Sequence, residues 1–370
     1  MPAYFQHGHS DQPQWEDAVV SCFSQLGEIS PAANLGFVYV SDRLIGHLAD
    51  ILARLKQLTG VAHWVGSSGI GVCCTSQEYL DQAAVAVMLG AFPAGSFRVV
   101  PTLRTLEDVS SALASGDGQP YFGIVHADPE NPQVPELIRE FAARMESGFV
   151  VGGVTSSRSQ HLQVADEVTH GGLSGVVFSS QVGVSTRLTQ GVSPLGGRHV
   201  VTECERNVVS QLDHRPALDV LREEIGELLF RDPSRMAEYV FVGLPIPGSD
   251  TGDYLVRNLV GLDMDNRLLA INEYVQEGTT LMFCRRDGAS AVEDMQRMLD
   301  SMQAGLSSAP TGGVYFSCLG RGESLFGPGS AELRMISQAL GDIPIVGFFA
   351  NGEISHNRIY GYTGVLTLFV

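Results

Sequence analysis

The chain repeats one structural pattern three times, and this repeat constrains its fold more than any other feature. In each copy an apolar strand leads into an amphipathic helix, and the helix leads into a second apolar strand that contains a Val-Gly step. The second strand then runs into a stretch rich in Gly, Ser, Thr and Asn. A repeated unit fixes the fold class, and the loops that join its elements are where binding residues concentrate.

The three copies can be located from the order of their elements. First strands are expected at residues 36–40, 121–125 and 314–318, helices at about 42–59, 134–147 and 330–340, and second strands with their loops at 63–69, 150–156 and 345–353. Strand–helix–strand units favour parallel pairing, whereas a strand that follows a Gly-rich loop closely favours antiparallel pairing. We therefore predict an α/β protein of two domains, in which repeated strand–helix–strand–strand units form mixed sheets with flanking helices.

Other segments fit the same architecture. Short strands rich in Val, Phe and Tyr are expected at about 84–89, 97–100, 175–180, 239–243, 279–284 and 364–369. Asp213 and Pro216 open a helix that runs to Leu229, and Ser290–Glu293 has capping-box spacing ahead of a further helix. Asp263–Asn266 is expected to be a hairpin turn between two strands.

Length and local composition predict how the chain divides. At 370 residues it is too long for one core of ordinary size and suits two domains. The Gly- and Pro-rich stretch Gln190–Arg198 marks a boundary. This gives an N-terminal extension over residues 1–33, a first domain over residues 34–195 and a second domain over residues 196–370.

The charge of the chain excludes some partners. Its formal net charge of −18 repels phosphate backbones and anionic lipids, so we expect binding neither to nucleic acid nor to a membrane. The start of the chain lacks the basic and then apolar pattern of a signal sequence, which predicts a cytoplasmic location. His7 and His9 are expected in a flexible tail, and no pattern indicates a metal site or a cofactor. Lys56 is the only lysine, and no Gly-rich loop precedes it to hold a phosphate.

No familiar catalytic pattern is present, so we expect a binding protein more readily than an enzyme. The six cysteines contain no Cys-x-x-Cys pair and fit a reduced compartment. One enzymatic alternative uses Cys318 or Cys73 as a nucleophile. It requires a thiolate, and Arg321, three residues after Cys318, would have to lower the thiol pKa.

The stretches after the first two Val-Gly steps supply candidate ligand-binding residues. They are Ser67, Ser68 and Gly69 in the first copy and Gly153, Thr155 and Ser156 in the second. Small residues let a ligand approach the backbone closely and expose amide donors. Tight turns would explain either stretch alone, but their recurrence at equivalent positions favours a shared cleft.

The third copy adds charge to the candidate site. Cys318 and Arg321 follow its first strand, and Asn351 and Glu353 follow its second strand. If those strands are neighbours, the guanidinium and the carboxylate rise from one sheet edge, where they would hold the carboxylate and the ammonium of an amino acid. The alternative is that Arg321 and Glu353 pair with each other as a structural bridge. Phe326 would provide an apolar wall.

Several of these segments resemble a known family, FIST, named for F-box and intracellular signal transduction proteins. Glu205–Leu218, Phe316–Arg321 and Ile345–Ile354 look like the FIST C-terminal module. The region from Gly36 to Ser156, with its two Val-Gly stretches, is similar to the FIST N-terminal module. The two modules come in the expected order and cover most of the chain.

The resemblance implies a function that the residues alone do not give. FIST modules are regarded as sensory domains for small ligands, with amino acids as the suggested ligands, and they often adjoin a signalling output domain. Residues 1–33 are too short for a kinase, a methyl-accepting domain or an F-box, so we expect the output to pass through a separate partner protein. The resemblance supplies no catalytic residues. A protein-interaction scaffold whose loops merely turn is the alternative function.

Overall fold

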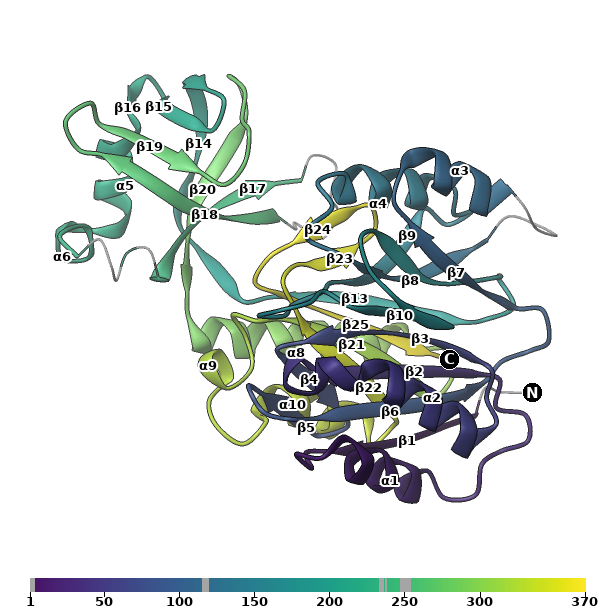
Figure 1. Ribbon diagram of the computed structural model, residues 1–370. Coiled ribbons are helices and arrows are strands. Elements are labelled where there is room, and N and C mark those ends of the chain that lie inside the picture. Colours follow the sequence, from purple (N-terminus) through teal and green to yellow (C-terminus); the bar gives the residue numbers. More distant parts are fainter. Residues whose placement is uncertain (1–3, 115–119, 233–235, 237, 247–253) are drawn as a thin grey trace. The chain divides into compact units, whose positions relative to one another are not determined.

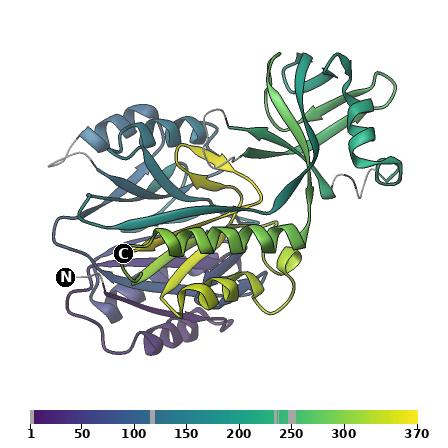
Figure 2. The same ribbon diagram turned by 180° about the vertical axis from the view of Figure 1, so that it is seen from behind.

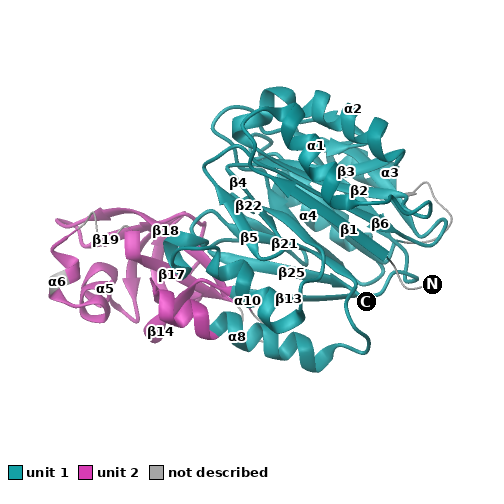
Figure 3. Cartoon of the chain, turned by 90° about the horizontal axis from the view of Figure 1, so that it is seen from below, with its two compact units in different colours: residues 1–189, 294–370 teal, residues 190–293 magenta. Residues whose placement is uncertain are grey.

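The computed structural model describes residues 4–114, 120–232, 236, 238–246 and 254–370. The chain forms two compact units, which Figure 3 colours separately. Unit 1 combines residues 1–189 with residues 294–370, and unit 2 comprises residues 190–293. Unit 2 is therefore an insertion in the sequence of unit 1, whereas the sequence predicts two consecutive domains.

Unit 1 contains three copies of one element order. The first copy has β1 (Tyr4–Ser10), α1 (Trp15–Leu26), β2 (Leu35–Ser41), the 3-10 helix η1 (Asp42–His47), α2 (Leu48–Thr59), β3 (His63–Gly69), β4 (Gly71–Cys74), β5 (Gln77–Leu80) and β6 (Val85–Ala91). The second has β7 (Phe97–Leu103), α3 (Leu106–Ala114), β8 (Phe122–Ala127), α4 (Val134–Ala143), β9 (Phe149–Val154), β10 (Gln163–Ala165), β11 (Glu167–Thr169) and β12 (Leu173–Phe178). The third has β13 (Val184–Gln190), α8 (Gly288–Gly305), β21 (Gly312–Cys318), α9 (Glu323–Phe326), α10 (Ala331–Leu340), β22 (Ile345–Ala350), β23 (Glu353–Ser355), β24 (Arg358–Tyr360) and β25 (Thr363–Phe369).

Each copy builds most of one mixed sheet and gives a hairpin to another. The sheets have the orders β1-β6-β2-β3-β10-β11, β7-β12-β8-β9-β23-β24 and β13-β25-β21-β22-β4-β5. The two strands of each strand–helix–strand unit are parallel, as predicted. The next hairpin is antiparallel to its neighbour but lies in a different sheet, so the three hairpins are exchanged cyclically among the copies.

The repeated Val-Gly step has a structural role at the same position in each copy. A Cβ atom on Gly66, Gly152 or Gly347 would lie 1.7–1.8 Å from the carbonyl oxygen of the residue paired with it on the parallel strand. Those partners are Val38, Val125 and Tyr315. Because a backbone oxygen cannot yield that much space, only glycine fits at these positions.

The structure confirms the predicted α/β class and most elements, but it corrects two predictions. Ser67, Ser68, Gly69 and Gly153 lie inside β3 and β9 rather than in loops, because the small residues are used for close strand packing. The N-terminal residues with His7 and His9 form β1, which pairs with β6, and are not a flexible tail. Alternating buried side chains hold this strand against the first sheet.

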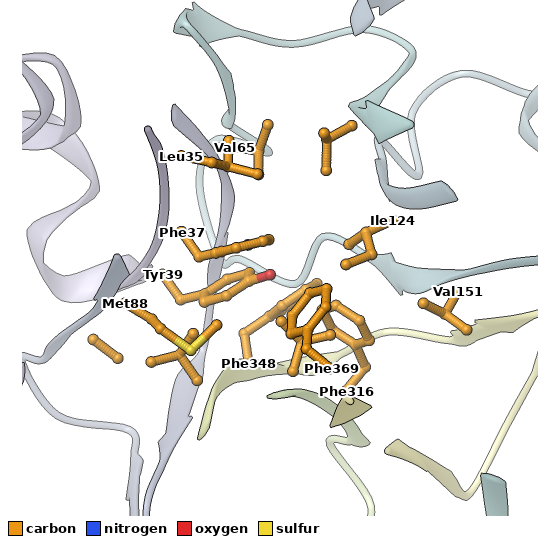
Figure 4. Close-up of a cluster of buried hydrophobic side chains, with 14 of the residues drawn as sticks. Leu35, Phe37, Tyr39, Val65, Met88, Ile124, Val151, Phe316, Phe348 and Phe369 are labelled. Carbon is orange, nitrogen blue, oxygen red and sulfur yellow. The ribbon is translucent and has the colours of Figure 1, made fainter. Parts of the chain in front are cut away.

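The inner faces of the three sheets share one aromatic core, part of which Figure 4 shows. Tyr39, His126 and Phe316 occupy equivalent positions in the three copies. Each follows by one residue the strand partner of the glycine in the Val-Gly step. Their ring centroids are 5.5–6.1 Å apart, and Phe348 contacts all three rings. Burial lowers the pKa of His126 to about 3, so this histidine is neutral.

The outer face of each sheet is covered by helices of its own copy, as Figures 1 and 2 show from opposite sides. Apolar side chains of α1 and α2 pack on the first sheet, those of α4 on the second, and those of α8 and α10 on the third. The helical apolar stripes predicted from sequence therefore face these sheets. Among the described residues, no helix combines the length and apolar character needed to cross a membrane.

Unit 2 is a small antiparallel barrel with its own apolar core. Its elements are β14 (Val192–Glu205), β15 (Val208–Leu212), β16 (Arg215–Pro216), α5 (Ala217–Ile225), α6 (Glu227–Phe230), β17 (Val240–Pro245), β18 (Tyr254–Asp263), β19 (Leu268–Ile271) and β20 (Thr280–Arg286). Its strands have the order β14-β20-β17-β18-β19-β15, and the barrel closes because the last strand, β15, also pairs with the first, β14. The predicted turn at Asp263–Asn266 joins β18 to β19 and is confirmed.

Candidate ligand-binding site

The ends of β3, β9 and β22 meet in unit 1, as the repeat led us to expect. The hydroxyl groups of Ser67 and Thr155 are 2.9 Å apart. The Ser156 hydroxyl donates to the carbonyl oxygen of Phe349 at 2.5 Å and accepts from the backbone N–H of Ile70 at 3.0 Å. Polar groups of the first two copies therefore contact each other here, and Ser156 of the second copy also contacts the third.

This meeting point is closely packed. Ser67, Ser68, Thr155 and Ser156 are all buried, and the Ser68 hydroxyl donates to a backbone carbonyl. A Cβ atom added to Gly69 or Gly153 would lie 3.0 Å or less from the side chain of Phe348. The hydroxyls of this junction are therefore satisfied within the protein, and its small residues allow strand ends from different copies to approach.

The charged residues of the third copy have a different partner from the one that the sequence suggests. Arg321 is fully buried, and its Nε donates to Oε1 of Glu332 at 2.7 Å. Glu332 lies in the first turn of α10 and is also fully buried. The expected alternative of a structural bridge between Arg321 and Glu353 is therefore wrong, because Glu332 provides the carboxylate.

Both carboxylate oxygens of Glu332 accept hydrogen bonds from other groups of the protein. The Tyr315 hydroxyl donates to Oε1 at 2.6 Å, and the backbone N–H of Gly322 donates to Oε2 at 2.9 Å. The Ser317 hydroxyl lies 3.1 and 3.2 Å from the two carboxylate oxygens. Glu332 therefore orients Arg321, and its own oxygens are not left for a ligand.

The terminal nitrogens of Arg321, unlike its Nε, are not hydrogen-bonded to Glu332. Among the described residues, neither Nη1 nor Nη2 has a hydrogen-bond partner. The guanidinium carbon lies 4.9 Å from the ring centroid of Phe326 in α9, so an aromatic ring lies beside the charge. Burial lowers the pKa of Arg321, but the charges and hydrogen bonds of Glu332 and Tyr315 together raise it above its ordinary value, and the guanidinium stays protonated.

Glu353 is a buried carboxylate with one satisfied oxygen. It begins β23 and pairs in register with Gly153 of β9. The backbone N–H and the hydroxyl of Thr363 donate to Oε2 at 3.1 and 2.8 Å, whereas Oε1 has no partner among the described residues. Burial raises the pKa of Glu353 to about 8, although Thr363 and the charge of Arg321 act in the opposite direction.

Cys318 does not have the environment of a nucleophile. Burial, and then the charge of Glu353, raises the pKa of its thiol well above the ordinary range, and Arg321 has only a small opposing effect. Burial and the charge of Glu332 likewise raise the pKa of Cys73. Both thiols are therefore protonated at neutral pH, so neither meets the requirement of the enzymatic alternative.

The structure brings some predicted site residues together and separates others. Cys318, Arg321 and Glu353 influence one another electrostatically in one buried region. Asn351 is exposed, and its backbone N–H donates to the carbonyl oxygen of Val154. The serines and glycines of the first two copies belong to the packed strand junction.

Sequence reasoning missed two acidic residues of this region, Glu332 and Glu78. Glu332 precedes Leu333 and lies four residues before Ile336, so it falls on the apolar face of its helix, which is a detectable signal. Glu78 lies in the short strand β5 and carries no comparable signal. In the described residues, no cluster of three or more His, Cys, Asp or Glu side chains has the arrangement of a metal site.

Comparison with known proteins identifies the family to which the chain belongs. The sequence matches the FIST N domain over residues 34–215 and the FIST C domain over residues 217–356. It is 31% identical over 339 residues to an uncharacterized protein of Mycobacterium tuberculosis strain CDC 1551, covering 87% of each chain. It is also 29% identical over 340 residues to an uncharacterized protein of Mycobacterium bovis, covering 87% of this chain and 86% of the relative. The chain therefore belongs to the FIST family.

Proposed function

We propose that this protein is a cytoplasmic sensor or regulator that binds a small amino-acid-like molecule at the charged region around Arg321 and Glu353. Arg321 holds the carboxylate of the ligand and Glu353 holds its ammonium group. Binding is communicated to a separate partner protein. FIST modules are regarded as sensory, and membership in that family supports this class of function.

One observation carries the proposal: two fully buried ionisable side chains, a guanidinium and a carboxyl group, each have polar atoms that lack a hydrogen-bond partner among the described residues. These atoms are the terminal nitrogens of Arg321 and Oε1 of Glu353. Buried charged groups are normally paired, since removing them from water without compensation is costly. A molecule with a carboxylate and an ammonium group would satisfy both side chains at once.

The arrangement also suits the chemistry of an α-amino acid. A guanidinium has donors in a planar fork that fits a carboxylate, and Glu332 already fixes the orientation of that fork through Nε. The Phe326 ring over the guanidinium provides an apolar surface beside the charged groups. The protonated thiol of Cys318 favours binding over covalent catalysis.

The first test is a thermal-shift screen of the purified protein against amino acids and related metabolites. A ligand present at 100 times its Kd stabilises the folded state by about 2.7 kcal/mol, which shifts a melting midpoint measurably. We expect stabilisation by molecules that carry both a carboxylate and an amine. A screen without any hit would contradict the proposal and support the interaction scaffold, for which co-purification with a partner protein is the corresponding measurement.

The second test changes Arg321 while keeping its charge. In Arg321→Lys the ammonium can still pair with Glu332, but the fork that would hold the ligand is lost. We expect calorimetry to show affinity weakened by roughly 10–100-fold, since a charge-assisted hydrogen bond contributes about 1.5–3 kcal/mol. Arg257→Lys, at the Arg257–Glu273 pair of unit 2, is the matched control and should leave binding unchanged. Equal affinity in Arg321→Lys and the unsubstituted protein would remove Arg321 from the site.

A further inference from the structure

Glu78 is a second buried carboxylate near Arg321 and has no assigned role. It is 5% exposed, and neither of its carboxylate oxygens has a hydrogen-bond partner among the described residues. Its backbone is held firmly, since Glu78 pairs in register with Cys73 of β4 and its N–H donates to the Ser330 hydroxyl. The side chain is therefore positioned by the third sheet but not satisfied by it.

Glu78 adjoins the Arg321–Glu332 pair through Gly322. A Cβ atom on Gly322 would lie 3.2 Å from Oε1 of Glu78, and the N–H of Gly322 donates to Glu332. The one positive charge of Arg321 is already paired with Glu332, so Glu78 adds an uncompensated carboxylate to this group. Burial, and then the charge of Glu332, raises the pKa of Glu78 to about 7.

One short segment, Gly322 and the helix α9 that follows it, lies against both Arg321 and Glu78. The helix α9 places Phe326 over the Arg321 guanidinium, and Gly322 at its start lies against Glu78. Gly322 and Gly327, on either side of α9, have φ angles of 59° and 89°, which other residues adopt only with strain. Phe326 is partly exposed, whereas Arg321 and Glu78 are buried, so α9 and Gly322 extend from these two side chains toward the surface.

The geometry points to a basic amino acid as the ligand, with its side-chain cation bound to Glu78. This inference rests on the proposed function, in which Arg321 takes the carboxylate and Glu353 the α-ammonium group. Around Arg321, the ionisable side chains with buried atoms that lack a partner among the described residues are one guanidinium and two carboxyl groups. A molecule with one carboxylate and two cationic groups matches that set, whereas a neutral amino acid leaves Glu78 uncompensated.

The test compares L-lysine with L-norleucine, which has the same carbon chain without the side-chain ammonium group. We expect calorimetry to show that lysine binds roughly 10–100-fold more tightly, as for a charge-assisted contact. Glu78→Gln should abolish this difference by weakening lysine binding while leaving norleucine binding unchanged. Glutamine has nearly the size and shape of glutamate, and neither Glu78 oxygen has a hydrogen-bond partner in the part of the chain that the structure describes. The glutamine variant should therefore fold, and circular dichroism checks this.

The control and the contradictory outcomes separate this inference from the proposed function. Glu323→Gln alters an exposed carboxylate in the adjoining α9 and should keep the preference for lysine. Equal binding of norleucine and lysine, or a preference that survives Glu78→Gln, would overturn the role of Glu78 and leave the amino-acid site intact. Failure of both amino acids to bind would overturn the proposed function and this inference together.

Discussion

The two compact units stabilise their interiors in different ways. Unit 1 buries many polar side chains, including the charged residues Glu78, Arg321, Glu332 and Glu353. Among the described residues of unit 2, Gln190 is the sole buried polar side chain, and the barrel core is otherwise apolar. An apolar interior is sufficient for a stable fold, and a buried ion pair is often no more stabilising than apolar residues. The buried charges of unit 1 therefore indicate a function other than stability.

Ion pairs show the same contrast. Those of unit 2, such as Arg257–Glu273 and Arg267–Asp219, are accessible to solvent on at least one side. The Arg321–Glu332 pair of unit 1 is inaccessible on both sides. Water screens and solvates an exposed pair, so the loss of one partner costs little, whereas a buried charge without its partner is strongly unfavourable.

The largest expected difference between the units comes from removing one charge of each pair. Glu332→Gln leaves the Arg321 guanidinium without a countercharge in the interior, and we expect it to lower the free energy of unfolding by about 3–5 kcal/mol. Glu273→Gln in unit 2 should change it far less. Urea denaturation of both variants measures the two effects. Similar losses in the two variants would show that burial of the pair does not set its importance.

A second comparison tests the close strand pairing of unit 1. In Gly347→Ala the new Cβ would lie 1.7 Å from the Tyr315 carbonyl oxygen, so the two parallel strands must separate. We expect a loss of about 3 kcal/mol, at the upper end for overpacking. In Gly261→Ala, on a barrel strand of unit 2, the Cβ would be in ordinary contact at 3.7 Å from Ala270. Melting midpoints should fall only in Gly347→Ala, and an unchanged midpoint there would refute the steric explanation.

A third prediction concerns the dependence of stability on pH. The pKa of Glu353 is raised from 4.5 to about 8, so the folded protein binds more protons than the unfolded chain between these values. Stability is therefore lost as the pH rises through this window. Glu353→Gln keeps an oxygen to accept from Thr363 and removes the charge. We expect the variant to be more stable than the unsubstituted protein at about pH 8.5 and nearly unchanged in stability at about pH 4.5.

Urea denaturation at the two pH values measures whether Glu353→Gln gains stability over the unsubstituted protein as the pH rises. A variant that is equally stable at both would show that Glu353 titrates normally in the folded protein.

The parts of the site that were predictable are those encoded locally. Arg321 and Glu353 follow strands at positions that the apolar pattern defines, and Glu332 lies within a helix whose start and end are visible in the sequence. The pairing of Arg321 with Glu332 was not predictable, because the acidic residue comes from a helix eleven positions later and Glu353 was an equally plausible partner in sequence. Glu78 reaches this region only because its hairpin joins the third sheet.

The sequence by itself determined the repeated elements, the mixed sheets and the family, because periodic apolar residues and recurring glycines act over short distances along the chain. Tertiary structure alone decided the cyclic exchange of hairpins and the insertion of the barrel. It also decided which charges are buried without partners. The physical reason is that a hairpin such as β4–β5 satisfies its own internal hydrogen bonds, so its sequence does not specify which sheet edge it joins. That choice depends on the packing of all three copies around their shared aromatic core.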